Sequence, residues 1–128
     1  MGIYESGENY LETILLLEKR NGRVRSIDIA NQLAYSKPSI SRAMGILREG
    51  GYIIMAENGD IILTEKGRNR ANGIYERHKL ITEYLVRALG VDVETANEDA
   101  CRIEHIISEH SFEKIKAWVS DQPLQFSL

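Results

Sequence analysis

A thiol, a carboxylate and an imidazole lie within five consecutive residues of the sequence, at Cys101, Glu104 and His105. With about 3.6 residues per helical turn, residues three and four apart share one face of a helix. Sulfur, oxygen and nitrogen donors on one face form part of the coordination shell of a divalent transition metal. The pattern predicts a metal site that needs further ligands from elsewhere in the chain. For Cys101 alone the alternative is a small buried apolar side chain.

Length and composition restrict the class of protein. The 128 residues suffice for one core with a smaller appended part, but not for two large domains. No apolar run approaches the roughly 20 residues of a membrane span, and the first residues lack the pattern of a signal peptide. A single cysteine excludes an internal disulfide and fits a reducing compartment. We therefore expect a cytoplasmic protein with no membrane partner.

Charge is unevenly distributed along the chain, although the net charge is only -3. Residues 1–77 contain 11 basic and 10 acidic side chains, whereas residues 78–128 contain 5 and 9. The carboxy-terminal half is acidic, as a cation site requires. The amino-terminal half is balanced and can still carry a local basic face for nucleic acid.

Three helical segments are expected before residue 50. Apolar side chains recur at helical spacing over about residues 8–19, 26–33 and 37–47. Ser26 and Ser36 stand where helix N-caps are expected. The second and third segments, joined by a short turn, form a predicted helix-turn-helix, whose second helix enters the DNA major groove with its amino-terminal residues.

Four polar residues occupy that end of the predicted recognition helix: Lys37, Ser39, Ser41 and Arg42. They can contact phosphates and base edges of double-stranded DNA, and the alternative is a merely solvated helix face. Residues 52–64 follow at once as two β-rich runs around Asn58-Gly59, a hairpin signal. Helix-turn-helix and hairpin together predict a winged helix. Arg23 or Arg25 is a further candidate for a phosphate contact.

Three more helices are expected after the hairpin, over about residues 64–89, 91–108 and 112–119, the last capped by Ser111. They are too thin for an independent core, so we expect them to form a homodimer, which suits a palindromic operator. The dimerising side chains are expected to be Leu80, Tyr84, Ile103, Ile106 and Ile107. The tail from residue 121 is expected to be loosely docked.

The predicted fold is therefore mainly α. It consists of a winged helix-turn-helix DNA-binding domain, residues 1–70, followed by an all-helical metal-binding and dimerisation domain, residues 71–128.

Several motifs together resemble the diphtheria toxin repressor family of metal-dependent transcriptional regulators, in its short two-domain form. They are the Asn9-Tyr-Leu-Glu12 segment, the winged helix, Leu63-Thr-Glu-Lys-Gly67, Arg77-His78 and Asp99-Ala-Cys-Arg-Ile-Glu-His105. Residue by residue, the resemblance implies metal ligands at Glu12, His78, Cys101, Glu104 and His105. It also implies that Fe(II) or Mn(II) switches a dimer to its operator-binding form.

The chain departs from the family pattern at three positions. Asn9 stands where an aspartate or methionine ligand is usual, and an amide oxygen is a neutral, weaker donor. Thr82 and Asn97 replace a carboxylate and a histidine of an ancillary site. Cys101 resembles the iron sensors, while Glu12 and His78 resemble the manganese sensors. The sequence leaves the identity of the metal open between Fe(II) and Mn(II), with Zn(II) or Co(II) as substitutes.

These observations predict a metal-dependent repressor that controls metal-ion homeostasis. One alternative is a winged-helix repressor that responds to an organic ligand or to no effector, with the cluster as packing. A metal-dependent enzyme is disfavoured, because no further general base stands beside the cluster. A metal-storage protein that has lost its operator is disfavoured by Lys37 and Arg42.

Overall fold

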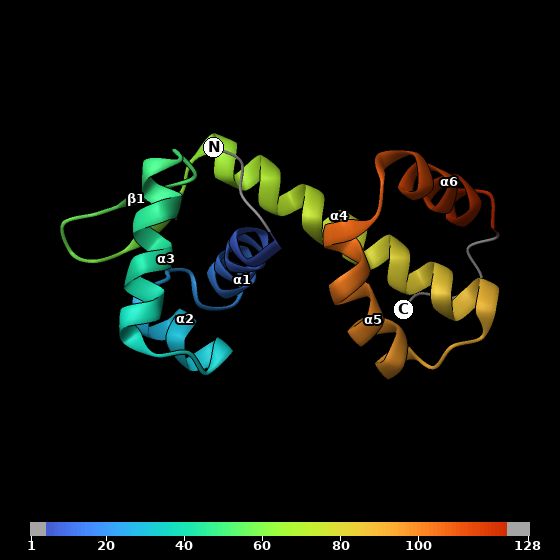
Figure 1. The fold of residues 1–128 in the computed structure, drawn as a ribbon, viewed down its shortest axis with the longest axis horizontal. Helices are drawn as coiled ribbons and strands as arrows, with labels where there is room; N and C mark the ends of the chain where they lie inside the picture. The colour runs from blue at the N-terminus through green and yellow to red at the C-terminus, as the bar shows by residue number, and fades with distance from the viewer. Residues whose placement is uncertain (1–4, 123–128) are drawn as a thin grey trace. The chain divides into compact units, whose positions relative to one another are not determined.

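The computed structural model describes residues 5–122, and the chain divides into two units, residues 1–73 and 74–128. The part of the predicted tail beyond residue 122 lies outside the described residues. The helices are α1 (Glu5–Asn21), α2 (Ser26–Leu33), α3 (Lys37–Glu49), α4 (Glu65–Leu89), α5 (Val93–Ile106) and α6 (Glu109–Ser120), and the strands are β1 (Ile53–Met55) and β2 (Ile61–Leu63) (Figure 1). The predicted fold class, mainly α with a winged helix-turn-helix, is confirmed.

The first unit is built on three helices and a two-stranded sheet. Helix α2 packs on α1 and α3, α3 packs on β1, and α1 packs on β2 (Figure 1). Its large, fully buried aliphatic side chains are Leu11, Ile14, Leu15, Val24, Ile29, Ile40, Met44, Leu47 and Ile53. Because these residues come from all three helices and the strand, the unit has a continuous apolar core of its own.

The turn between α2 and α3 contains a residue with positive φ, Ala34, and the N-cap of α3, Ser36. Ala34 ends α2 in the left-handed region, with φ 58. Ser36 caps α3 as predicted, since its hydroxyl accepts a hydrogen bond from the backbone N–H of Ser39. The prediction of Ser26 as the cap of α2 is wrong by one residue. Arg25 holds that position, and the Asp28 carboxylate accepts a hydrogen bond from its backbone N–H at 2.9 Å.

The predicted hairpin is present. Strands β1 and β2 are antiparallel, with Ile54 opposite Ile62. The turn is closed by the backbone N–H of Ala56 bonded to Asp60 O, and Gly59 takes φ +90. Glycine adopts that conformation without steric cost, which explains the Asn58-Gly59 signal.

The Leu63–Gly67 motif fastens the start of α4 to the turn before β1. The hydroxyl of Thr64 donates to Gly51 O at 2.6 Å and accepts from the backbone N–H of Gly67. A Cβ added to Gly67 would lie 1.9 Å from Tyr52 O, so only glycine fits this approach. The ammonium group of Lys66 donates to Gly50 O and lies over the Tyr52 ring.

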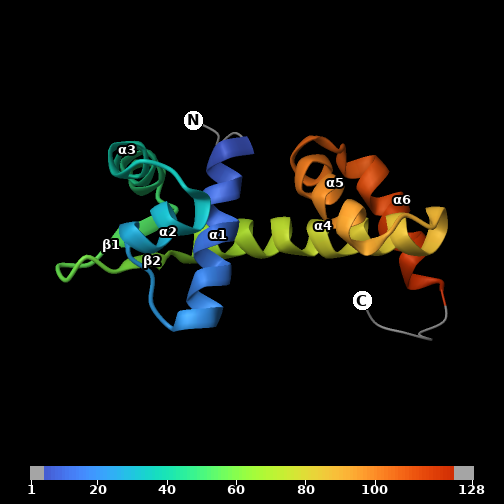
Figure 2. The same ribbon diagram turned by 90° about the horizontal axis from the view of Figure 1, so that it is seen from below.

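The second unit contains the remainder of α4 with α5 and α6 packed on it (Figure 2). Its buried core cluster has one residue from each helix, Ile81, Ala100 and Phe112. The prediction that Ser111 caps the last helix is wrong, because α6 begins at Glu109 and Ser108 is the cap. The hydroxyl of Ser108 accepts a hydrogen bond from the backbone N–H of Ser111 at 3.1 Å.

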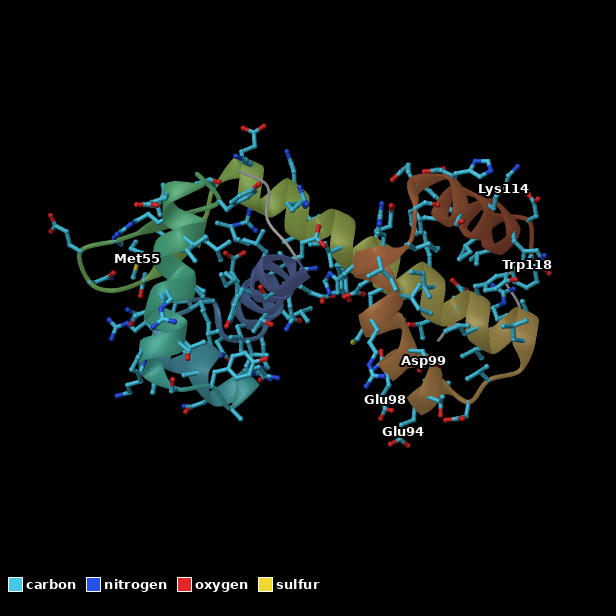
Figure 3. The ribbon with its side chains drawn as sticks, in the orientation of Figure 1. Met55, Glu94, Glu98, Asp99, Lys114 and Trp118 are labelled. Atoms are coloured by element: carbon cyan, nitrogen blue, oxygen red, sulfur yellow. The ribbon has the colours of Figure 1, made fainter. Side chains whose placement is uncertain are left out.

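The side chains predicted to dimerise do not share one environment. Leu80, Ile103 and Ile107 pack against the core cluster of the second unit. The ring of Tyr84 meets Trp118 of α6 edge to face, with centroids 5.4 Å apart (Trp118 is labelled in Figure 3). Ile106 is 73% exposed.

Among the helices between residues 5 and 122, none combines the length and apolarity that crossing a membrane requires.

Candidate metal centre and DNA-binding surface

The second unit brings four of the predicted metal ligands together. The ring nitrogen Nδ1 of His78, on α4, lies 2.9 Å from Glu104 Oε2 and 3.8 Å from Cys101 Sγ, both on α5. The other carboxylate oxygen of Glu104, Oε1, lies 3.3 Å from Nε2 of His105. We call these four residues the α4–α5 cluster. Nitrogen, oxygen and sulfur donors therefore converge within one unit, as the spacing of Cys101, Glu104 and His105 predicted.

Asn97 lies beside the same cluster, although its contact with His78 was not predicted from the sequence. Its amide oxygen Oδ1 lies 2.5 Å from Nε2 of His78. The signal was available, because Asn97 precedes Cys101 by four residues and so stands on the same helix face. Thr82 also contacts His78, because its hydroxyl donates a hydrogen bond to the backbone oxygen of His78 at 2.7 Å. Both departures from the ancillary-site pattern thus lie next to His78.

The donors of the α4–α5 cluster fit a divalent cation. The side chain of Glu104 is 1% exposed, and within residues 5–122 no hydrogen bond reaches its buried Oε1. Because the contact of Oε1 with His105 Nε2 at 3.3 Å is not a hydrogen bond, this oxygen keeps lone pairs that are costly to leave unused in a buried position. Nδ1 of His78 faces both a carboxylate oxygen and a thiol sulfur. A cation would give such converging lone pairs a shared partner.

Arg77 holds the end of α5 that carries Glu104 and His105. Its Nη1 donates to the backbone oxygens of Glu104 at 3.3 Å and Ile107 at 3.2 Å. Its Nη2 bonds Glu109 Oε2 at 2.8 Å, and the guanidinium lies over the Phe112 ring. The last carbonyls of a helix lack partners within the helix. Arg77 supplies such partners beside the cluster, a role that the Arg77-His78 motif did not reveal in the sequence.

The remaining predicted ligands, Asn9 and Glu12, lie on α1 in the first unit. They are three residues apart and therefore neighbours on one helix face. Thr13 donates its hydroxyl to the backbone oxygen of Asn9 at 2.8 Å. Since the two units are described separately, Asn9 and Glu12 stay predicted ligands.

Other acidic and imidazole side chains of the second unit lie outside the cluster. Glu94, Glu98 and Asp99 are exposed and project from α5 into solvent (Figure 3). His110 is exposed in the first turn of α6. These residues provide matched controls for substitutions in the cluster.

The four predicted DNA contacts occupy the first turns of α3: Lys37, Ser39, Ser41 and Arg42. All four are exposed, while Ile40, Met44 and Leu47 of the same helix are buried. The core therefore needs none of the four. The Ser36 hydroxyl contacts Ser39 Oγ at 3.0 Å, so the cap also orients this candidate.

A second basic feature lies beside the hairpin. Asp60 Oδ1 accepts hydrogen bonds from Nε of Arg23 at 2.9 Å and from Nε of Arg25 at 3.4 Å. Hydrogen bonding to Arg23, with a smaller contribution from Arg25, lowers the pKa of the Asp60 carboxyl despite partial desolvation. Asp60 is thus ionised at neutral pH, and its hydrogen bonds hold the side chains of both arginines in place.

Each of the two units matches a known protein-domain family. Residues 3–60 match the iron dependent repressor N-terminal DNA binding domain. Residues 64–121 match the iron dependent repressor metal binding and dimerisation domain.

Individual relatives agree with this match. An uncharacterized HTH-type transcriptional regulator of Methanocaldococcus jannaschii is 35% identical over 116 residues, which cover 90% of this chain and 93% of that protein. The HTH-type transcriptional regulator MntR of Bacillus pumilus is 34% identical over 110 residues, covering 86% of this chain and 76% of that protein. The chain spans about half the length of other relatives, 47% of the diphtheria toxin repressor of Corynebacterium diphtheriae, for example.

A solved structure described as a manganese-dependent transcriptional repressor in complex with manganese superposes with a TM-score of 0.82 and 25% sequence identity. The match covers 91% of this chain and 53% of that chain. The resemblance seen in the sequence motifs is thereby confirmed, and the findings favour a metal-dependent repressor over a repressor of organic ligands. Because both units and nearly the whole length are matched, the chain belongs to the iron-dependent repressor family, whose members are metal-dependent, DNA-binding transcriptional regulators and not enzymes.

Proposed function

We propose that this protein is a cytoplasmic, homodimeric repressor that controls metal-ion homeostasis by binding a palindromic operator when Fe(II) or Mn(II) is bound. Residues 1–70 form the DNA-binding domain in this proposal, and residues 71–128 form the metal-binding and dimerisation domain. The observation that carries it is the convergence of Cys101, His78 and Glu104 within the second unit of a chain of this family.

The proposed metal ligands are His78, Cys101, Glu104 and His105, completed by Glu12 and, as a weaker neutral donor, Asn9. A bound divalent cation supplies the positive charge that holds carboxylate, thiolate and imidazole donors together. Arg77 and Asn97 orient these donors, through the end of α5 and through the His78 ring respectively. Harder donors favour Mn(II) and the Cys101 thiol favours Fe(II), with Zn(II) or Co(II) as substitutes.

Metal affects DNA binding because the proposed ligands belong to both units of the chain. Glu12 shares α1 with Leu11, Ile14 and Leu15, which are buried in the core of the DNA-binding unit. Ligation of Glu12 therefore acts on the element against which the helix-turn-helix packs. Coupling of this kind is reciprocal, and about 1–3 kcal/mol corresponds to a change in operator affinity of roughly 5–150-fold. The proposed DNA contacts are Lys37, Ser39, Ser41 and Arg42.

The test is selection of DNA fragments from a random pool by anaerobic, reduced protein at fixed salt, in parallel with Mn(II), Fe(II), Zn(II) and chelator. We expect a palindrome to be enriched only with metal. The selected fragment is then titrated with the double variant Glu104→Gln/His105→Asn, which should lose the metal response. The matched control, Glu98→Gln/His110→Asn, changes the same residue types at exposed positions and should keep it.

Enrichment of the same palindrome in chelator would refute the metal switch and leave DNA binding intact. A full metal response in Glu104→Gln/His105→Asn would refute the ligand assignment. Absence of any enriched sequence would refute DNA binding itself.

A further inference from the structure

Residues 23–25 lie alongside the hairpin and are joined to it by a backbone hydrogen bond. The backbone N–H of Ile61, on β2, donates to Val24 O at 2.7 Å. The side chain of Val24 is buried, at 1% exposed. In extended backbone, alternate side chains point to opposite sides. Arg23 and Arg25 therefore share the solvent side of this segment.

Asp60 holds the two arginines in one place. Its Oδ1 accepts from both guanidinium groups, as described above, and its Oδ2 accepts from the Asn58 side-chain amide at 3.3 Å. Asn58 in turn accepts a hydrogen bond from the backbone N–H of Asp60 at 3.0 Å. A single carboxylate, itself fixed by the hairpin turn, thus orients two cationic side chains that would otherwise repel one another.

The cluster retains capacity for an anion. Two guanidinium groups against one carboxylate leave one net positive charge. The side chains of Arg23 and Arg25 are 53% and 46% exposed. Each guanidinium carries five N–H donors in a planar fork, and the contacts with Asp60 use only part of them. Such a fork matches the oxygens of a phosphate group.

We propose that Arg23 and Arg25 together bind one backbone phosphate of the operator in each subunit, and that Asp60 is the residue that positions them. This inference rests on the proposed function. The first helix of a helix-turn-helix crosses the DNA backbone, and Arg25 is the N-cap residue of α2. A phosphate contact sets the position of the protein on DNA and carries no sequence information.

The test compares the salt dependence of DNA binding by the wild type and by Arg23→Met/Arg25→Met. Both are titrated with metal present, on the selected palindrome and on an unrelated duplex. One phosphate per subunit contributes about 0.9 to the slope of log K against log salt, so the dimer should lose about 1.8. The loss should be similar on both duplexes, which leaves the specificity ratio nearly unchanged.

Two further variants separate this effect from its alternatives. Lys114→Met/Lys116→Met removes the same number of charges from α6 and should leave the slope unchanged (Lys114 is labelled in Figure 3). Arg23→Lys/Arg25→Lys preserves charge and should retain the slope. If the double methionine variant does not fold, Arg25→Met, which preserves the Arg23–Asp60 pair, should lose part of the slope.

An unchanged slope in a folded methionine variant, with the wild type binding DNA, would overturn this inference and leave the proposed function standing. An equal loss of slope in the Lys114/Lys116 control would also overturn it, because net charge alone would then explain the effect. If the wild type binds neither duplex, the proposed function fails first.

Discussion

The two units differ in what they bury. The first encloses aliphatic side chains from α1, α2 and α3, keeps ion pairs such as Arg68–Glu18 near the surface, and leaves its buried carboxylate, Glu12, 8% exposed. The second has a core cluster of only Ile81, Ala100 and Phe112, and one of its most buried side chains is a carboxylate, Glu104. An apolar core stabilises a fold without any ligand, whereas a carboxylate as buried as Glu104 depends on the groups that pair with it, here the imidazole of His78 at 2.9 Å.

We therefore expect the stability of the second unit to respond more strongly to a bound cation than the stability of the first. The difference also gives each unit a distinct response to metal, to substitution and to pH, and those responses can be measured separately. Trp118 is the only tryptophan in the sequence and belongs to α6. Its fluorescence therefore reports on the second unit alone.

The largest expected effect is that of metal removal on the second unit. At a free Mn(II) concentration about 100 times Kd, binding should stabilise the folded state by about 2.7 kcal/mol. This corresponds to a shift of Tm by roughly 10–20 °C for a unit of fewer than 100 residues. Thermal unfolding followed by Trp118 fluorescence, with Mn(II) and with chelator, measures it. Identical melting curves in the two conditions would contradict the comparison.

Gly67→Ala should destabilise the first unit. The new Cβ would meet Tyr52 O at 1.9 Å, so the start of α4 must shift, at a cost of about 1–3 kcal/mol. Urea unfolding followed by amide hydrogen exchange in α3 measures the loss. Gly73→Ala is the control, since no atom lies within 4 Å of its added Cβ. If both substitutions have equal effects, the close approach is not the cause.

Arg77→Met should weaken Mn(II) binding by about 10-fold, because the end of α5 that carries Glu104 loses its support. Isothermal titration measures the affinity, and the absorption spectrum of the Co(II)-loaded protein reports on ligand geometry. Lys116→Met removes a cation from an exposed ion pair with Glu76 and is the control. A variant with lower thermal stability but unchanged affinity and spectrum would show that Arg77 supports only the fold.

The smallest expected effect concerns pH and the first unit. Hydrogen bonding to Arg68 lowers the pKa of Glu18, against the opposing effect of desolvation. This stabilisation is present above the unfolded-state pKa of Glu18 and is lost as pH falls through the lower folded-state value. For a pair this exposed it amounts to less than about 1 kcal/mol. Arg68→Met should reduce stability at pH 7 and converge with the wild type in acid, which urea titrations across pH can test.

Cap and turn signals in the sequence were reliable where a neighbouring residue fixed their position. Ser36 was predicted correctly because Pro38 fits the first turn of a helix that begins just after Ser36, and the Asn58-Gly59 turn was predicted correctly because it lies between two apolar runs. The start of α6 was misplaced because Ser108 and Ser111 are three residues apart and both are good caps. The start of α2 was misplaced because arginine is an unusual cap, and Asp28 provides the compensating hydrogen bond from inside the helix.

For the candidate metal site, too, the sequence pattern identified only part of the residues that lie together. Helical spacing was enough to group Cys101, Glu104 and His105 on one face of α5. It could not bring in His78, whose ring meets that face only through the packing of α4 on α5. The resemblance to a family supplied His78, and the contact of its ring with Asn97 emerged only in three dimensions.

Ala34 has a consequence for how such turns vary during evolution. Holding alanine in the left-handed region, at φ 58, costs about 1–2 kcal/mol. Glycine would remove that cost but would lose about 0.5–1 kcal/mol through its greater freedom in the unfolded chain. The second effect offsets about half of the first, so alanine is tolerated at this position at a net cost of roughly 0.5–1 kcal/mol. A search pattern that demands glycine in the turn of a helix-turn-helix would therefore miss proteins such as this one.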